Sequence, residues 1–168
     1  MSTNIKTFKY KIGLAVIRAQ PFHNGHGHLI ATMLADSETG IVLLGGKDSP
    51  LDARNPFTYQ ERAQMLKNAC PSARLRIGGI NDIGCPPLWA AHVMFETWEQ
   101  FKLQPTAYYA GVGQDARLFA AAGLVAVALP RDKIEISATQ IRSDCEKYQD
   151  FVHPANLELI KSKLTNQI

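Results

Sequence analysis

The sequence predicts an α/β protein built on a doubly wound, parallel, five-stranded sheet with helices on both faces. Short apolar segments of strand length alternate with longer segments of helical spacing, and the connections between them are short. The first strand, expected at Ile12 to Ile17, is apolar throughout and contains β-branched residues, which is typical of a strand buried on both faces. At 168 residues, the chain is expected to form a single domain over 1–168.

The remaining elements follow in regular alternation. After the first helix, strands are expected at 40–45, 74–80, 106–110 and 124–129. A capping box of Thr58 and Glu61 begins a helix that ends near Ala69, and further helices are expected over 88–101, 115–122, 137–145 and 155–164. Ligands of such sheets bind beyond the carboxyl ends of the strands, where the strand order reverses. The loops 20–26, 111–115 and 130–137 should therefore share one crevice.

Composition excludes several classes of partner. Hydrophobic residues make up 46% and charged residues 20% of the chain, as in an ordinary soluble globular protein. The net charge of +3 includes no block of five like charges, so no nucleic-acid partner is expected. The first eleven residues are polar and no apolar run approaches ~20 residues, so neither secretion nor a membrane span is expected. Three widely spaced cysteines fit a reduced, cytoplasmic compartment.

The segment that follows the first strand has the composition of a phosphate site. A turn with Gly25 leads directly into a helix, whose first backbone N–H groups lack partners and suit an anion. His23 and His26 stand three residues apart, so their rings can face one spot, and Arg18 adds a permanent positive charge.

A second candidate site lies near the C-terminus. Ser137 and Thr139 are good helix caps, and Arg142 follows within the same helix. On its own this is as consistent with a capped surface helix as with a ligand site. Beside the histidine segment, it would add hydroxyl and guanidinium donors for triphosphate oxygens.

Two other readings of these motifs are weaker. His23, His26 and His28 could bind zinc with one cysteine, but the second ligand pair expected of a structural zinc site is missing. The stretch from Gly40 to Asp48 looks superficially like a P-loop. It has one residue too many, an aspartate where the magnesium-binding hydroxyl should be, and a strand where the loop should be.

The string RAQPFHNGH at 18–26 resembles the signature of HIGH-type nucleotidyltransferases and, more narrowly, that of archaeal-type nicotinamide-mononucleotide (NMN) adenylyltransferases. SATQIR at 137–142 is similar to the second signature of that family. Similar strings occur at 54–62, RNPFTYQER, and at 81–93, NDIGCPPLWAAHV, so the resemblance covers about 12–164. It implies a Rossmann-like fold.

The resemblance also implies the reaction: ATP and NMN would give NAD and pyrophosphate. The NMN phosphate, ionised near neutral pH because its second pKa is about 6, would be the nucleophile, so no protein base is required. Mg²⁺ would be carried by ATP, without a protein metal site. ATP and NMN are thus the expected partners, and a homo-oligomer is possible.

By the same resemblance, roles are assigned to individual residues. The catalytic group would consist of His23, His26, Arg18 and Arg142. ATP would be bound by Gln20, Phe22, Gly25, Ser137, Thr139 and Arg142, and NMN by Arg54, Asp82, Ile83 and Trp89.

Ile17 and Ala19 stand where the family usually has Gly and Phe. This departure leaves open a sister adenylyl- or cytidylyltransferase acting on another phosphorylated acceptor. It also leaves open a non-catalytic nucleotide-binding regulator on the same fold. The residues do not distinguish nicotinamide from nicotinate mononucleotide as the acceptor.

Overall fold

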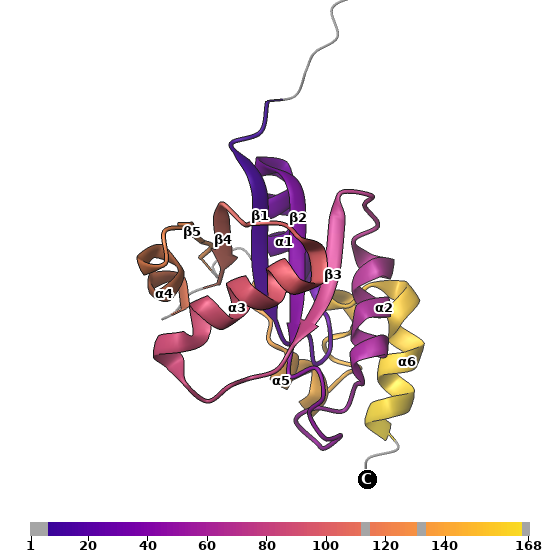
Figure 1. The fold of residues 1–168 in the computed structure, drawn as a ribbon. Helices are drawn as coiled ribbons and strands as arrows, with labels where there is room; N and C mark the ends of the chain where they lie inside the picture. Colours follow the sequence, from indigo (N-terminus) through magenta and orange to yellow (C-terminus); the bar gives the residue numbers. More distant parts are fainter. Residues whose placement is uncertain (1–6, 112–114, 131–133, 166–168) are drawn as a thin grey trace, which may run out of the picture.

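The fold is known from a computed structural model that describes residues 7–111, 115–130 and 134–165. A five-stranded parallel sheet lies at its centre, with the strand order β3-β2-β1-β4-β5 (Figure 1). The strands are β1 (Tyr10–Ile17), β2 (Ser37–Gly45), β3 (Leu75–Ile80), β4 (Ala107–Ala110) and β5 (Val125–Ala128). The order reverses between β1 and β4, as expected for a doubly wound sheet.

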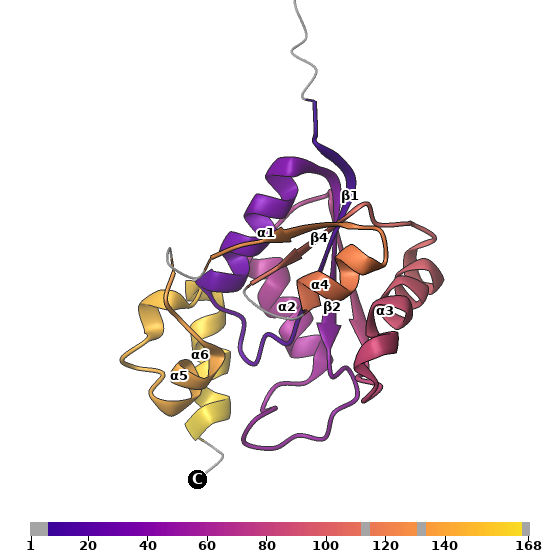
Figure 2. The same cartoon turned by 90° about the vertical axis from the view of Figure 1, so that its left-hand side faces the viewer.

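Helices cover both faces of the sheet. They are α1 (Asn24–Asp36), α2 (Tyr59–Ala69), α3 (Pro86–Phe101), α4 (Asp115–Ala121), α5 (Ala138–Ser143) and α6 (Pro154–Thr165), with a short 3₁₀ turn, η2 (Gln149–Phe151). One core cluster contains buried residues of α1, α2, α5 and α6, and the other contains those of α3 and α4. In Figure 2, α1 and α6 accordingly lie on one side of the sheet and α3 on the other. The predicted fold class is confirmed.

Several boundaries differ from the predicted ones. β2 begins at Ser37 rather than at residue 40, because α1 leads into the strand without a loop and Ser37 already pairs with Tyr10 of β1. α3 begins at Pro86 rather than at Leu88, in keeping with the preference for proline at the first position of a helix. α5 ends at Ser143, two residues earlier than predicted. The Thr58–Glu61 capping box is present as predicted.

None of the described helices is both long and apolar enough to cross a membrane.

The helix that follows the first strand packs closely against the sheet, and Gly13 makes this possible. A Cβ atom at Gly13 would lie 2.6 Å from Met33 Cγ and 2.6 Å from Ser37 Oγ. Met33 and Ser37 are both fully buried, so neither side chain can move aside without disturbing the core. The missing side chain at Gly13 therefore sets the depth at which α1 lies on β1.

We expect Gly13→Ala to lower the free energy of unfolding by about 1–3 kcal/mol, because the added methyl overpacks this contact. Gly27→Ala is the matched control, since a Cβ there would have only Phe22 Cε1 near it, at 4.0 Å. As a glycine-to-alanine change inside α1, it should stabilise by about 0.5–1 kcal/mol. Urea unfolding of both variants measures the difference, and equal effects would contradict the close approach.

Candidate functional site

A cavity of about 880 Å³ opens at the carboxyl ends of β1 and β4. Its lining includes the loop after β1, the start of α1, the loop between β2 and α2, the end of β4 and the segments before and within α5. Described residues of all three loops predicted to share a crevice, 20–26, 111–115 and 130–137, line this cavity. Residues 112–114 and 131–133 of those loops lie outside the described residues. The volume is in the range of ordinary small-ligand sites.

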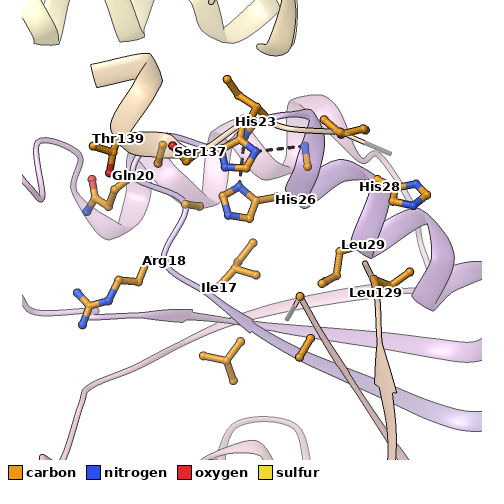
Figure 3. Close-up of a pocket in the computed structure, with 18 of the residues that line it drawn as sticks. Ile17, Arg18, Gln20, His23, His26, His28, Leu29, Leu129, Ser137 and Thr139 are labelled. Carbon is orange, nitrogen blue, oxygen red and sulfur yellow. Dashed lines mark hydrogen bonds between the residues drawn. The ribbon is translucent and has the colours of Figure 1, made fainter. Parts of the chain in front are cut away.

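The predicted catalytic histidines form the start of α1. His23 is the N-cap residue, and its Nδ1 accepts a hydrogen bond from the Gly25 N–H at 3.1 Å. His26 Nδ1 accepts in turn from the His23 N–H at 3.3 Å. The two rings stack with their centroids 3.8 Å apart (Figure 3). A Cβ at Gly25 would lie 3.0 Å from the His23 ring, so glycine leaves the room this ring occupies.

These backbone contacts determine where each imidazole carries its proton. A ring nitrogen that accepts a hydrogen bond carries no proton, so a neutral His23 or His26 is protonated on Nε2. Each ring then has an N–H donor on the nitrogen that does not contact the start of α1. The helix cap therefore sets the two rings as donors, which suits an anion in the cavity they line.

The second predicted motif lies against the first. Arg142 of α5 donates hydrogen bonds to the main-chain oxygen of Gln20 and, at 3.1 Å, to Thr139 Oγ1. Ser137 caps α5, and Ser137, Thr139 and Arg142 all line the cavity. The two motifs are 122 residues apart at the contact between Arg142 and Gln20.

The lining is rich in positive charge. Three arginines, Arg18, Arg54 and Arg142, and two aspartates, Asp52 and Asp115, are among the described lining residues. Burial lowers the pKa of Arg142 below its usual value, and repulsion from Arg54 lowers it further. Hydrogen bonds from the backbone of Asn55 and Arg54 lower the pKa of Asp52, so this carboxyl is ionised at neutral pH. Two guanidinium groups that repel each other across a cavity favour an anion between them.

Two residues predicted to contact ATP, Gln20 and Phe22, have side chains that are engaged within the protein; Gln20 also lines the larger cavity, whereas Phe22 is not among its described lining residues. Gln20 is 4% exposed; its Nε2 donates to the Phe57 oxygen at 2.9 Å, and its Oε1 accepts from the Phe57 N–H at 3.0 Å. Phe22 is 1% exposed and packs in the core, with its ring centroid 5.4 Å from that of His26. Both side chains hold the loop in place: the amide of Gln20 is hydrogen-bonded to the backbone of Phe57, and the ring of Phe22 is packed in the core.

Backbone strain accompanies this loop. Ala19 has φ of 51° and is 1% exposed. A left-handed conformation costs a non-glycine residue about 1–2 kcal/mol, so the surrounding contacts must hold it. The following Gln20–Pro21 peptide bond is cis.

A second cavity of about 400 Å³ adjoins the first. Asp82, Ile83 and Trp89 line it, whereas the fourth residue predicted to bind NMN, Arg54, lines the first cavity. Trp89 is half-buried; it packs against the core cluster under α3 and α4. Four residues line both cavities: Val16, Ile17, Arg18 and Asp115. Arg18 forms an ion pair with Asp82 at this junction.

Sequence reasoning did not identify Arg62, which is 1% exposed. Its guanidinium donates to the main-chain oxygens of Arg18 at 2.7 Å, Gly45 at 2.7 Å and Gly46 at 3.0 Å. Burial lowers the pKa of Arg62, and the neighbouring charge of Arg18 lowers it further. The available signal was its helical spacing, since Arg62 shares the buried side of α2 with Ala63, Met65 and Leu66. Asp52 and Asp115 were not predicted as site residues either.

In the described part of the chain, no group of three or more His, Cys, Asp or Glu side chains is placed to hold a metal ion.

Residues 18–144 match the model of a family described as cytidylyltransferase-like. The chain belongs to this family. Archaeal proteins are similar to this chain over most of its length. It is 29% identical to the nicotinamide-nucleotide adenylyltransferase of Methanospirillum hungatei over 154 residues, which cover 88% of this chain and 86% of the relative. It is 30% identical to the enzyme of that name from Halorubrum lacusprofundi, over 73% of this chain and 70% of the relative. The resemblance inferred from the motifs is confirmed.

A solved structure shares the fold. The bifunctional NMN adenylyltransferase/ADP ribose pyrophosphatase of Francisella tularensis, complexed with AMP and a manganese ion, superimposes with a TM-score of 0.71 at 18% identity. The match covers 94% of this chain and 52% of that one, so the chain spans about half of the larger protein. At this identity the likeness concerns the Rossmann-like fold.

We expect Gln20→Ala to lower the free energy of unfolding by about 2–4 kcal/mol, because it leaves the buried N–H and C=O of Phe57 without their partner. Gln64→Ala is the control, since Gln64 is exposed on α2 and its amide donates to Asn68 Oδ1. This change should alter the free energy of unfolding by no more than about 0.5 kcal/mol. If the two variants unfold alike in urea, Gln20 is not the anchor of the loop.

Proposed function

We propose that the protein transfers the AMP moiety of ATP to nicotinamide mononucleotide, forming NAD and pyrophosphate. The similarity to archaeal nicotinamide-nucleotide adenylyltransferases supports this function over most of the chain. The arrangement of two adjoining cavities supports it as well, because the reaction must hold two nucleotides with their phosphates in contact.

The observation that carries the proposal is the meeting of the two phosphate motifs around the larger cavity. His23 and His26 supply N–H donors, Arg142 a guanidinium, and Ser137 and Thr139 hydroxyls, all from segments held by backbone contacts. Donors fixed in advance stabilise charge that develops on the α-phosphate and on the leaving pyrophosphate. The triphosphate of ATP is therefore assigned to this cavity, with Arg54 facing the same phosphates from the loop before α2.

The smaller cavity is assigned to the nicotinamide end of NMN. Trp89 offers an aromatic face, and Asp82 and Ile83 line the cavity beside it. Arg18 lies at the junction of both cavities, where the phosphate of NMN would meet the α-phosphate of ATP. This position gives Arg18 the role of drawing two anions together.

The step itself is a phosphoryl substitution. An oxygen of the NMN phosphate forms a bond to the α-phosphorus of ATP, and the bond from that phosphorus to the bridging oxygen breaks. Pyrophosphate leaves with the electron pair. The attacking phosphate is ionised near neutral pH, so positioning and charge neutralisation are sufficient and no protein base takes part. We assign Mg²⁺ to the triphosphate oxygens, since the nearby side chains are mainly nitrogen donors and hydroxyls.

The direct test is chromatography of the products after the protein is mixed with Mg²⁺, ATP and NMN. NAD and pyrophosphate should appear in equal amounts. His26→Ala is the matched low-activity variant, with turnover reduced on the order of 10²–10³ by loss of one fixed donor. Parallel reactions with CTP and with other phosphorylated acceptors test for a sister transferase. ATP binding without release of pyrophosphate would instead indicate a regulator.

Arg142→Lys should lower kcat/KM by about tenfold or more, because lysine keeps the charge but loses the planar, paired donors of the guanidinium. Arg76→Lys on β3 is the control, since its guanidinium bonds the main-chain oxygen of Ala73 and does not line the cavity. Steady-state kinetics decide the question. An Arg142→Lys variant as active as the control would mean that Arg142 does not donate paired hydrogen bonds to phosphate oxygens.

Trp89→Ala should raise the KM for NMN by about tenfold, because stacking of the pyridinium on the indole is worth about 0.5–2 kcal/mol. The KM for ATP should stay nearly unchanged. Trp98→Ala provides the control on the same helix, since Trp98 is exposed and lies outside both cavities. Separate KM values for the two substrates are required. An equal loss for ATP and NMN would assign Trp89 to the core of the protein rather than to the nicotinamide.

A further inference from the structure

Arg54 lies on an exposed loop at the mouth of the larger cavity, which it lines. The described residues between β2 and α2, 46–58, form neither helix nor strand, and the three residues before Arg54 are exposed as it is. An exposed loop samples many backbone conformations unless local hydrogen bonds restrict it, so a side chain on it does not keep one direction unaided. A contact within the loop must therefore fix the backbone at Arg54 if its guanidinium is to face the cavity.

The carboxylate of Asp52 makes that contact. Its Oδ1 accepts hydrogen bonds from the Arg54 N–H at 2.8 Å, the Asn55 N–H at 2.7 Å and Asn55 Nδ2 at 3.1 Å. The main chain closes the same turn, since the Asp52 N–H donates to the Asn55 oxygen at 3.3 Å and the Asn55 N–H donates to the Asp52 oxygen at 3.1 Å. Phe57, which is bonded to Gln20, follows two residues after Asn55. The backbone of Arg54 is thus fixed on both sides.

A carboxylate at this place is unexpected in an anion site. Asp52 lines the larger cavity together with Arg54 and Arg142. Burial and then the charge of Arg54 lower the pKa of Arg142, while Asp52 acts in the opposite direction, so the three charged groups act on one another. The negative charge of Asp52 repels the phosphates that the two arginines attract. Its presence is explained if its hydrogen bonds within the loop matter more than this repulsion.

We infer that Asp52 is a positioning residue, which fixes the backbone of this loop so that Arg54 faces the triphosphate of ATP. The inference rests on the proposed function. Two properties of the Asp52 side chain act in opposite directions, because the acceptor oxygen holds the loop while the negative charge weakens the binding of phosphate. Substitutions separate them: asparagine keeps a side-chain oxygen that can accept from the same N–H groups but is uncharged, whereas alanine loses both properties.

Asp52→Asn should bind ATP with Mg²⁺ at least as tightly as the unaltered protein and up to about tenfold more tightly, since the turn is kept and the repulsion is removed. Asp52→Ala should bind ATP about tenfold more weakly than Asp52→Asn, because the loop loses its acceptor and Arg54 its direction. In an Arg54→Ala background the two substitutions should bind ATP alike, because the effect of Asp52 passes through that guanidinium.

Asp48→Ala is the matched control for the loss of a carboxylate from this loop. Asp48 Oδ2 accepts from Asn81 Nδ2 at 2.8 Å, and Asp48 is not among the described lining residues of either cavity. The affinity of this variant for ATP should equal that of the unaltered protein.

The experiment is titration calorimetry of the full chain and these variants with ATP and Mg²⁺, in parallel with NAD formation after NMN is added. A gap between Asp52→Ala and Asp52→Asn that closes in the Arg54→Ala background supports the inference, even if no NAD is formed and the proposed function fails. Equal affinity of the Asp52→Ala and Asp52→Asn variants overturns it, even if NAD is formed. A gap that persists without Arg54 also overturns it, since Asp52 would then act on the fold alone, and so does a failure of the unaltered protein to bind ATP.

Discussion

The guanidinium of Arg62 joins the three segments that frame the functional site. It is buried inside α2, and its hydrogen bonds go to main-chain oxygens of Arg18, Gly45 and Gly46, with a longer one of 3.3 Å from Nε to Thr58. A buried charge is costly unless its donors are satisfied, and here carbonyl dipoles at the ends of two adjacent strands do so. The loops after β1 and β2 therefore cannot separate from α2 without exposing or orphaning that charge.

Gln20 reinforces the same connection. Its side-chain amide holds Phe57, just before α2, while Arg62 holds Arg18, just before Gln20. The main-chain oxygen of Gln20 then accepts from Arg142 of α5. Through these contacts the loop after β1 is bound both to α2, by Arg62, and to α5, by Arg142. Donor side chains, among them Arg18, His26 and Arg142, line the cavity, and the strained backbone at Ala19 lies in the same loop. Such preorganisation is what phosphoryl transfer requires, since catalysis there depends on positioning and charge.

Much of this organisation could be predicted from the sequence, and the reasons are local. Apolar runs and their spacing determine strands and helices, so the order of elements and the shared crevice followed from general rules for parallel sheets. The histidine and Ser–Thr–Arg motifs carry their chemistry within a few residues. The roles of Gln20, Phe22 and Arg62 depend instead on partners 16 to 44 residues away or on core packing. No local pattern reveals that the side-chain amide of Gln20 bonds the backbone of Phe57. The pairing of Arg18 with Asp82 could not be predicted either, because the two residues are 64 positions apart in the sequence.

Hydrogen–deuterium exchange of Arg62→Met tests the central role of Arg62 most directly. Methionine keeps the apolar stem within the buried side of α2 but leaves the main-chain oxygens of Arg18, Gly45 and Gly46 without their donor. If Arg62 joins the loops, amide exchange should become faster in peptides covering both 18–23 and 45–49, while peptides from α3 and α4 keep their protection. Unchanged protection of both loops in the variant would contradict the claim that this buried guanidinium holds the site together.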